Sequence, residues 1–350
     1  MKSTIMKKPA KKIILMLIML AFLPSCETDE NDINLDNSLI IVHSTGNRYA
    51  IVSPATGKVI DEVEPGIQHH ISNVALGYNS NKALLLSKEP GGSYVKVIYS
   101  CDRKTGDNVL QVTSESMWDI QTMSASPAGA QIVFHGHPVD GGTSTSNLFK
   151  INIDGTGVQQ LTQNKEVVDG IELWWPGPPS WSPDGRKIAF RGTMRTPDPG
   201  AYWWGESVIL MDASGLNKQI LYNEPDANSG NHKDISWSKD GRFLVFLTYE
   251  YYSNPKNRVK VLDVEDGSIM DITDDLLVEG KHTTNLCTSP LENKIAFNKH
   301  QPGGGNLYVI DFIITSNGEF QISGPFKILA KVESGGLQFG SPDWQLWQQE

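Results

Sequence analysis

Trp181-Ser182-Pro183-Asp184-Gly185-Arg186-Lys187-Ile188-Ala189-Phe190 is the stretch of sequence that decides the fold. The chain reaches Ser182, turns through Pro-Asp-Gly, and continues as an apolar strand to Phe190. Proline presets φ for the first turn position, aspartate can bond its own backbone, and glycine accepts the positive φ that closes a hairpin. The stretch therefore predicts two antiparallel strands joined by a tight turn.

The same pattern returns along the chain. A second strong copy runs from Trp237 to Phe246, and weaker or degenerate copies contain the anchor residues Gly77, Ser126, Ser289 and Ser341. With Ser182 and Ser238, these anchors lie 49, 56, 56, 51 and 52 residues apart. A period near 50 with about four short strands per repeat is typical of a β-propeller. We expect an all-β chain, since no segment after the N-terminal region has sustained helical periodicity.

The two ends of the repeat region complement each other. Ser38–His43 has the character of the strand that follows the turn motif, but the strand before it is missing from the N-terminal end. A matching strand is found at Leu337–Asp343, followed by Trp344–Trp347. One blade shared between the termini would remove the open edge of the ring. The sequence thus predicts a six-bladed β-propeller over residues 38–350, with one blade closed between the N- and C-terminal strands.

The Trp-Ser-Pro-Asp-Gly turn resembles the mark of the TolB-like family of WD-like propeller repeats. The resemblance covers roughly residues 38–347 and is strong at Ser182 and Ser238. It implies the propeller fold, and fold alone does not fix function.

Residues 1–25 are predicted to be a signal peptide. Five lysines precede the apolar run Ile13–Leu23, which is too short to span a membrane as an ordinary helix. The following Leu23-Pro24-Ser25-Cys26 resembles a bacterial lipobox, which implies that Cys26 is lipidated and becomes the new N-terminus. The alternative is a plain signal peptide followed by a chance cysteine.

Residues 26–37 are predicted to be an acidic, flexible tether, because Glu27–Asp32 contains no apolar residue. The segment also resembles the acidic tags that send some lipoproteins to the outer face of the outer membrane; a simple linker is the alternative. We expect an outer-membrane lipoprotein, on its periplasmic or cell-surface side, with the membrane as a partner through the lipid.

Charge and cysteine content narrow the classes of partner. The formal net charge is −10, and removing the five lysines of residues 1–25 makes it −15. This balance argues against nucleic acid as a partner. Cys101 and Cys287 fall in different, non-adjacent repeats, so we expect two core thiols and no disulfide between them.

The loops divide between the two ends of the blades. The Ser-Pro-Asp-Gly turns and the turns between third and fourth strands share one end, which we call the turn end. The opposite end, here the long-loop end, is predicted to carry long loops at 135–147, 164–177, 191–206, 249–257, 274–285 and 298–305. Function gathers on loops held by a rigid scaffold, so the long-loop end is the candidate site.

The histidines fit that choice, since counting from the anchors places all eight at the long-loop end. The binding candidates are His70, His135, His137, His232 and His282. Three interpretations stay open: a divalent metal held by some of these five, a polar ligand pocket with histidine as hydrogen-bond partner, or polar loops in which histidine is simply tolerated.

Aromatic residues accompany the histidines. Trp175, Trp203 and Trp204 lie in the same predicted loops, and Arg191 begins one of them. Tryptophan offers a flat apolar face with a polar edge, which suits sugar rings or a protein hot spot. Packing of the loops on one another is the alternative.

No nucleophile elbow, phosphate-binding glycine loop or Cys-x-x-Cys pair accompanies the repeats. We therefore expect a lipid-anchored, extracytoplasmic binding module that holds a glycan fragment or a protein partner without catalysis. The alternatives are a metal-dependent polysaccharide lyase similar to oligogalacturonate lyase, and a TolB-like envelope docking protein.

Overall fold

The computed structural model divides the chain into two units, Met1–Ile33 and Asn34–Glu350, and every described residue belongs to the second. The described residues are 38–43, 47–67, 70–76, 81–88, 95–114, 119–137, 146–196, 204–225, 234–250, 256–276, 283–299, 306–330 and 342–346. Among them, no helix is long and apolar enough to cross a membrane.

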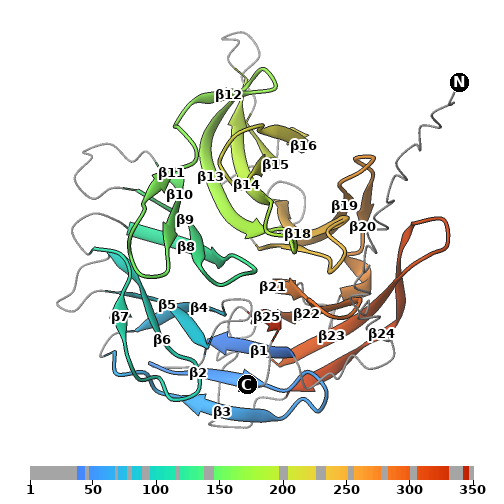
Figure 1. The fold of residues 1–350 in the computed structure, drawn as a ribbon. Helices are drawn as coiled ribbons and strands as arrows, with labels where there is room; N and C mark the ends of the chain where they lie inside the picture. The colour runs from blue at the N-terminus through green and yellow to red at the C-terminus, as the bar shows by residue number, and fades with distance from the viewer. Residues whose placement is uncertain are drawn as a thin grey trace, which may run out of the picture. The chain divides into compact units, whose positions relative to one another are not determined.

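Six antiparallel sheets form the six blades of a β-propeller (Figure 1), as the repeats predict. Blade 1 contains β4 (Ile71–Leu76), β5 (Lys82–Lys88), β6 (Lys96–Asp102) and β7 (Leu110–Gln111). Blade 2 contains β8 (Asp119–Ala125), β9 (Gln131–His137), β10 (Asn147–Asn152) and β11 (Gln159–Gln160). Blade 3 contains β12 (Glu166–Val168), β13 (Ile171–Trp181), β14 (Lys187–Arg195), β15 (Trp204–Asp212) and β16 (Gln219–Pro225).

The remaining blades complete the ring. Blade 4 contains β17 (Ile235–Trp237), β18 (Phe243–Glu250), β19 (Lys256–Asp263) and β20 (Ile269–Asp271), followed by a 3-10 turn at Asp274–Leu276. Blade 5 contains β21 (Thr283–Thr288), β22 (Lys294–Lys299), β23 (Leu307–Ile314) and β24 (Phe320–Ala330). Blade 6 contains β25 (Pro342–Leu346), β1 (Ser38–His43), β2 (Tyr49–Val52) and β3 (Val59–Val63).

The core lies between the blades. Six clusters of buried apolar residues each combine strands of two neighbouring blades, one cluster for every blade interface. At the interface of blades 3 and 4, for example, Val208 packs with Trp237 and Phe246. Burial of about 1.5–3 kcal/mol per large side chain at each interface holds the ring together.

The turn motif adopts the predicted conformation. In blade 3 the Ser182 hydroxyl donates to Asp184 Oδ1 at 2.6 Å, and the amide of Lys187 donates to Ser182 Oγ at 2.9 Å. Gly185 has φ +69°, as its position in the turn requires. Trp237 ties neighbouring repeats together, because its Nε1 donates to the carbonyl of Ser180 at 3.1 Å.

The terminal blade closes as predicted, but with a different strand. β25 pairs antiparallel with β1 and spans Pro342–Leu346, whereas the sequence predicted Leu337–Asp343. Trp344 lies opposite Ile40, the position that Trp237 takes opposite Leu244 in blade 4. Pro342 and Asp343 therefore lie in a strand, and Ser341 was wrongly assigned as the last turn anchor. The reason is local: the residue after Asp343 is tryptophan, which lacks the conformational freedom of the turn glycine.

The strands extend further toward the long-loop end than predicted. Residues 164–177 include β12 and the first half of β13, and residues 191–206 begin and end inside β14 and β15. The long-loop assignments were therefore wrong over these parts. β14 and β15 pair without a register shift from Lys187 opposite Asp212 to Arg195 opposite Trp204, so the ladder extends into the predicted loop.

Ending the chain after Ser341 removes β25 and leaves the edge of β1 without its partner. We expect a loss of about 3–5 kcal/mol in the free energy of unfolding, from about 1 kcal/mol per lost backbone hydrogen bond. Urea denaturation measures it. A chain ending after Leu346 is the matched control and should keep nearly all of its stability; equal stability of the two truncations would contradict closure by β25.

Candidate functional site

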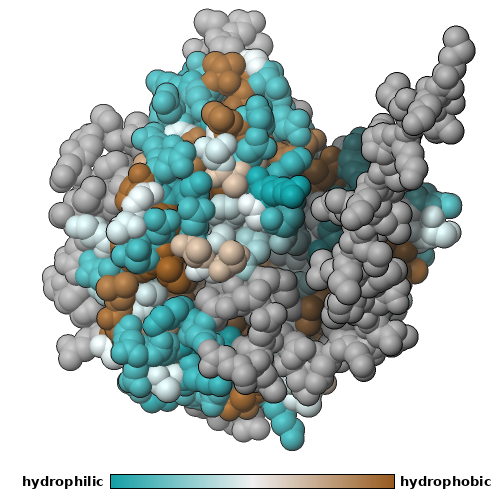
Figure 2. Space-filling model, in the orientation of Figure 1, coloured by the Kyte–Doolittle hydropathy of each residue, from teal (hydrophilic) through white to brown (hydrophobic). Residues whose placement is uncertain are grey.

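Among the described residues, blade 3 carries a fifth strand that the other blades lack. β12 and the start of β13 form a hairpin whose turn, Asp169-Gly170, has positive φ at both residues. This conformation is typical of a two-residue hairpin turn. Asp169 Oδ2 accepts a hydrogen bond from the amide of Ile220 in β16 at 2.7 Å, which attaches the tip of the hairpin to the outermost strand. Apolar residues reach the surface beside β12 (Figure 2), where Val167 is 63% exposed.

A β-bulge brings two tryptophans of β13 together. The register with β14 shifts between Leu173 and Trp175, so Trp174 is the extra residue. Successive residues of a regular strand point to opposite faces, but a bulge re-aims a side chain. The Trp174 and Trp175 rings lie 6.0 Å apart in an edge-on arrangement. Asn164 donates its side-chain amide to the Trp174 carbonyl at 2.9 Å, which pairs a carbonyl at the bulge.

Charged side chains surround the Trp174 ring. Lys165 Nζ lies 4.4 Å and the Arg195 guanidinium carbon 4.9 Å from the ring centroid, both at cation–π distance. Glu172 accepts a hydrogen bond from Trp174 Nε1 at 2.9 Å. Trp175, a predicted binding residue, is 39% exposed beside this group. We call Lys165, Glu172, Trp174, Trp175 and Arg195 the blade 3 aromatic cluster.

Arg191, another predicted binding residue, has a different environment. It lies inside β14, is fully buried, and forms an ion pair with the equally buried Glu206 of β15. Its guanidinium also lies 5.0 Å from the Phe246 ring of blade 4. Burial raises the pKa of Glu206, although the Arg191 charge opposes that rise. Arg191 therefore lies buried at the interface of blades 3 and 4, and its described contacts are with the fold.

Two predicted histidines share one face of blade 2. His135 and His137 are two residues apart in β9, so both side chains leave the same face of the strand. His135 lies opposite Thr122 of β8, and His137 lies opposite Asp119. His137 Nε2 lies 3.6 Å from Asp119 Oδ2. The His135 Nε2, Thr122 Oγ1 and Asp119 Oδ1 atoms are all buried without a hydrogen-bond partner. Burial, with a smaller contribution from His137, lowers the pKa of His135 to about 4, so its imidazole is neutral at pH 7.

The other predicted residues are not brought together with this pair by the described structure. His70 is exposed and directly precedes β4 of blade 1, and Trp204 begins β15. His232, His282 and Trp203 lie outside the described residues. Within the part of the chain that the structure describes, no group of three or more His, Cys, Asp or Glu side chains is placed to hold a metal ion. Cys101 and Cys287 are both buried and form no disulfide with each other.

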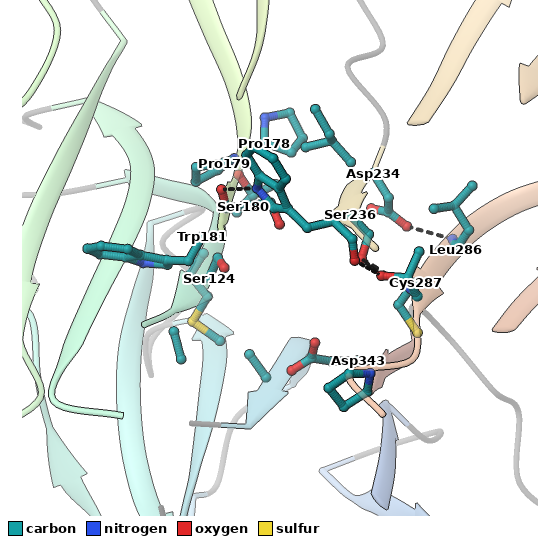
Figure 3. Close-up of a pocket in the computed structure, with 18 of the residues that line it drawn as sticks. Ser124, Pro178, Pro179, Ser180, Trp181, Asp234, Ser236, Leu286, Cys287 and Asp343 are labelled. Carbon is teal, nitrogen blue, oxygen red and sulfur yellow. Dashed lines mark hydrogen bonds between the residues drawn. The ribbon is translucent and has the colours of Figure 1, made fainter. Parts of the chain in front are cut away.

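The axis of the propeller contains a cavity that sequence reasoning missed. Its volume is about 210 Å³, and it is lined by the innermost strands of all six blades. One equivalent position, two residues before each anchor, supplies a lining residue from every blade: Ala75, Ser124, Ser180, Ser236, Cys287 and, by its register in β25, Asp343. Figure 3 shows Asp343 pointing into the open space between these strands. Small or polar residues two positions before the other five anchors were the signal in the sequence, whereas Asp343 follows the assigned anchor Ser341.

The cavity wall is held by side chains that reach from blade to blade. Asp234 Oδ2 accepts from the amide of Leu286 at 3.0 Å, and Asp343 Oδ2 accepts from the amide of Leu76 at 2.8 Å. Ser236 Oγ accepts from the amide of Thr288 at 3.1 Å. Thr288 and Leu76 occupy equivalent positions, each one residue before the anchor of its blade, so Ser236 and Asp343 make equivalent bonds. These bonds fix two carboxylates in the cavity wall.

The lowered pKa of His135 gives a testable pH dependence. The unfolded chain binds a proton near pH 6.5 but the folded chain only near pH 4, so the contribution of His135 to stability is present above pH 6.5 and is lost as pH falls toward 4. Between pH 7 and pH 5 we expect this residue to account for about 1–2 kcal/mol of the fall in unfolding free energy. Urea denaturation at both pH values should show a smaller fall for His135→Gln than for the unchanged protein. An identical fall would contradict the assignment.

Comparison with known proteins supports the fold. No protein-family model and no curated protein matches the sequence. Among solved structures, the chain is similar to one in the nidogen/laminin complex (TM-score 0.57, 10% identity, 89% of this chain and 100% of the other). It is also similar to a protein assigned as TolB from Agrobacterium tumefaciens (0.52, 15%, 89% and 99%). A third is an oligogalacturonate lyase from Vibrio parahaemolyticus (0.52, 12%, 82% and 77%). The chain therefore has the fold of a TolB-like six-bladed β-propeller.

Proposed function

We propose that this chain is a lipid-anchored, extracytoplasmic binding module that holds a glycan fragment on the blade 3 aromatic cluster. The observation that carries the proposal is the bulge at Trp174, which presents the exposed Trp175 beside a second indole and three charged side chains. Sugar rings stack their apolar C–H faces on aromatic rings while their hydroxyls seek charged and polar partners at the rim.

The rigidity of the cluster supports a binding role. Trp174 is fixed by its bond to Glu172, and the bulge by the bond from Asn164. Asp169 attaches the hairpin tip to β16. A surface that is already ordered loses little conformational entropy when a ligand binds.

The charge of the cluster favours an acidic sugar. Lys165 and Arg195 provide two cations against the single carboxylate of Glu172. These two cations lie on a chain whose formal net charge is −10. A carboxylated sugar would be attracted to the cluster and turned toward it. Catalysis forms no part of this proposal.

The glycan-binding surface can be tested with Trp175→Ala. An array of neutral and carboxylated oligosaccharides identifies ligands, and titration calorimetry then measures their affinity. We expect Trp175→Ala to weaken binding about tenfold or more, because the exposed stacking face is lost. Leu216→Ala is the control, since Leu216 is an exposed apolar residue (66%) in the turn before β16 of the same blade.

Unchanged affinity in Trp175→Ala would contradict the assignment of this surface. Absence of any glycan ligand, together with capture of a protein that Trp175→Ala no longer binds, would contradict the glycan class and leave the surface in place.

The lipid anchor has its own test at Cys26. Bacterial expression with an alkyne fatty acid should label the unchanged protein and place it in the membrane fraction. Cys26→Ala should lose both the label and the membrane association, since acyl chains supply the attachment. Cys101→Ala, which removes a buried thiol of blade 1, should keep both. Label that persists in Cys26→Ala would contradict lipidation at this residue.

A further inference from the structure

We infer that Asp169-Gly170, the tip of the blade 3 hairpin, is a site of covalent self-modification at which the aspartate converts to isoaspartate. The reaction joins neighbouring residues of one chain and needs no partner, cofactor or oxidant. The inference starts from a comparison of the Asp-Gly pairs in the described structure. They share the same two residue types, so any difference in reactivity between them comes from the fold.

The nucleophile of this reaction is the backbone amide of the glycine. Its nitrogen attacks Cγ of the preceding protonated carboxyl group, forms an N–Cγ bond and closes a succinimide ring. The hydroxyl of the carboxyl group and the amide proton leave together as one water molecule. Water then adds to the α-carbonyl of the ring and breaks its bond to nitrogen, so the backbone of the product runs through the former side chain. Glycine favours the attack because it has no side chain in the way.

The other Asp-Gly pairs hold this nucleophile in a hydrogen bond. Four further pairs lie in turns of the described residues, and in each the glycine amide donates to a backbone carbonyl at 2.8–2.9 Å or close to it. The four donors are Gly155, Gly185, Gly241 and Gly267, and their acceptors are the carbonyls of Asn152, Ser182, Ser238 and Asp263. Such an amide must give up its bond before it can attack.

The Gly170 amide is placed differently. Asp169 and Gly170 are the two turn residues of a hairpin, with φ +49° and +84°, and the ladder closes between the flanking residues Val168 and Ile171. Among the described residues, no hydrogen bond uses the Gly170 amide. Both turn residues are exposed, and nothing lies within 4 Å of the position that a Cβ of Gly170 would take. The nucleophile therefore has no bond to give up and has room to move.

A donor is aimed at the carboxyl group that would be attacked. The amide of Ile220 in β16 donates to Asp169 Oδ2 at 2.7 Å. When the Gly170 nitrogen attacks Cγ, negative charge develops on the carboxyl oxygen that remains. A backbone N–H at this distance stabilises that charge, as in an oxyanion hole. Oδ2 is then the oxygen that stays, and Oδ1 leaves as water.

The product would release the hairpin from the outer strand of blade 3. Isoaspartate adds a methylene to the backbone and carries its carboxylate one carbon closer to the chain, so the present bond to Ile220 is lost. The same hairpin leads into Trp174 and Trp175 of β13. A glycan bound there would find a less ordered surface as the protein ages. This consequence rests on the proposed function, whereas the modification itself does not.

The full chain, kept folded in warm neutral buffer, provides the test with its own controls. An aspartate-specific endoprotease does not cleave at isoaspartate, so mass spectrometry of the uncut peptides locates the product. We expect conversion at Asp169 to be about tenfold faster than at Asp184 or Asp240. In urea, where the turns are lost, the three sites should convert at similar rates. Equal rates in the folded protein would overturn the inference.

Ile220→Pro tests the assisting amide. The Ile220 N–H bonds to Asp169 from an outermost strand, a position at which proline is tolerated. We expect Asp169 to convert about tenfold more slowly in this variant, with Asp184 and Asp240 unchanged. An equal or faster rate at Asp169 would overturn the role of Ile220, and the comparison of folded protein with urea needs no variant.

Glycan binding separates this inference from the proposed function. Protein aged until Asp169 is isoaspartate should bind its oligosaccharide more weakly than fresh protein in titration calorimetry. Isoaspartate at Asp169 in a protein that binds no oligosaccharide would contradict the proposed function and support the modification. Equal affinity of aged and fresh protein would contradict the release of the hairpin.

Discussion

The structure depends on how the innermost strand of each blade satisfies the backbone amides and carbonyls on the edge that faces the propeller axis. Such a strand has a ladder partner on one side only, and an unpaired amide away from water is costly. Here the neighbouring blade supplies the acceptor: Asp234, Ser236 and Asp343 each accept an amide from the next innermost strand. These bonds join blade 4 to blade 5 and blade 6 to blade 1 at the axis. The two carboxylates and the serine hydroxyl in the cavity wall follow from this requirement.

The same requirement explains which parts of the fold the sequence revealed. The turn motif is local, because Ser182, Asp184 and Gly185 bond within a few residues, and so its repeats predicted the blade number and the closed ring. The last strand was misplaced because Pro342-Asp343 imitates the motif. Only pairing with β1, almost the whole chain length away, shows that Trp344 takes the repeated tryptophan position.

The candidate sites were less predictable for a related reason. Trp175 was identified by its residue type, but its environment depends on a bulge, which has no local pattern, and on a fifth strand, whose Asp169-Gly170 hairpin signal was overlooked. Arg191 was read as a loop residue, although the pairing of β14 with β15 buries it against Glu206. The cavity was missed because its wall takes single residues from six distant strands. Residue types can be read from a short stretch of sequence, whereas which side chains meet in one cavity depends on closure of the six blades into a ring.

Departures from the repeat are the places where function can be sought. A residue that matches its equivalents in the other blades is explained by the fold, as Ser180 and Ser236 are. The fifth strand of blade 3 and the extra residue at Trp174 have no such explanation, since the described parts of the other blades form without them. Together they add an ordered aromatic surface, which a propeller does not require. Features that a fold forms without are the places where a binding role is expected.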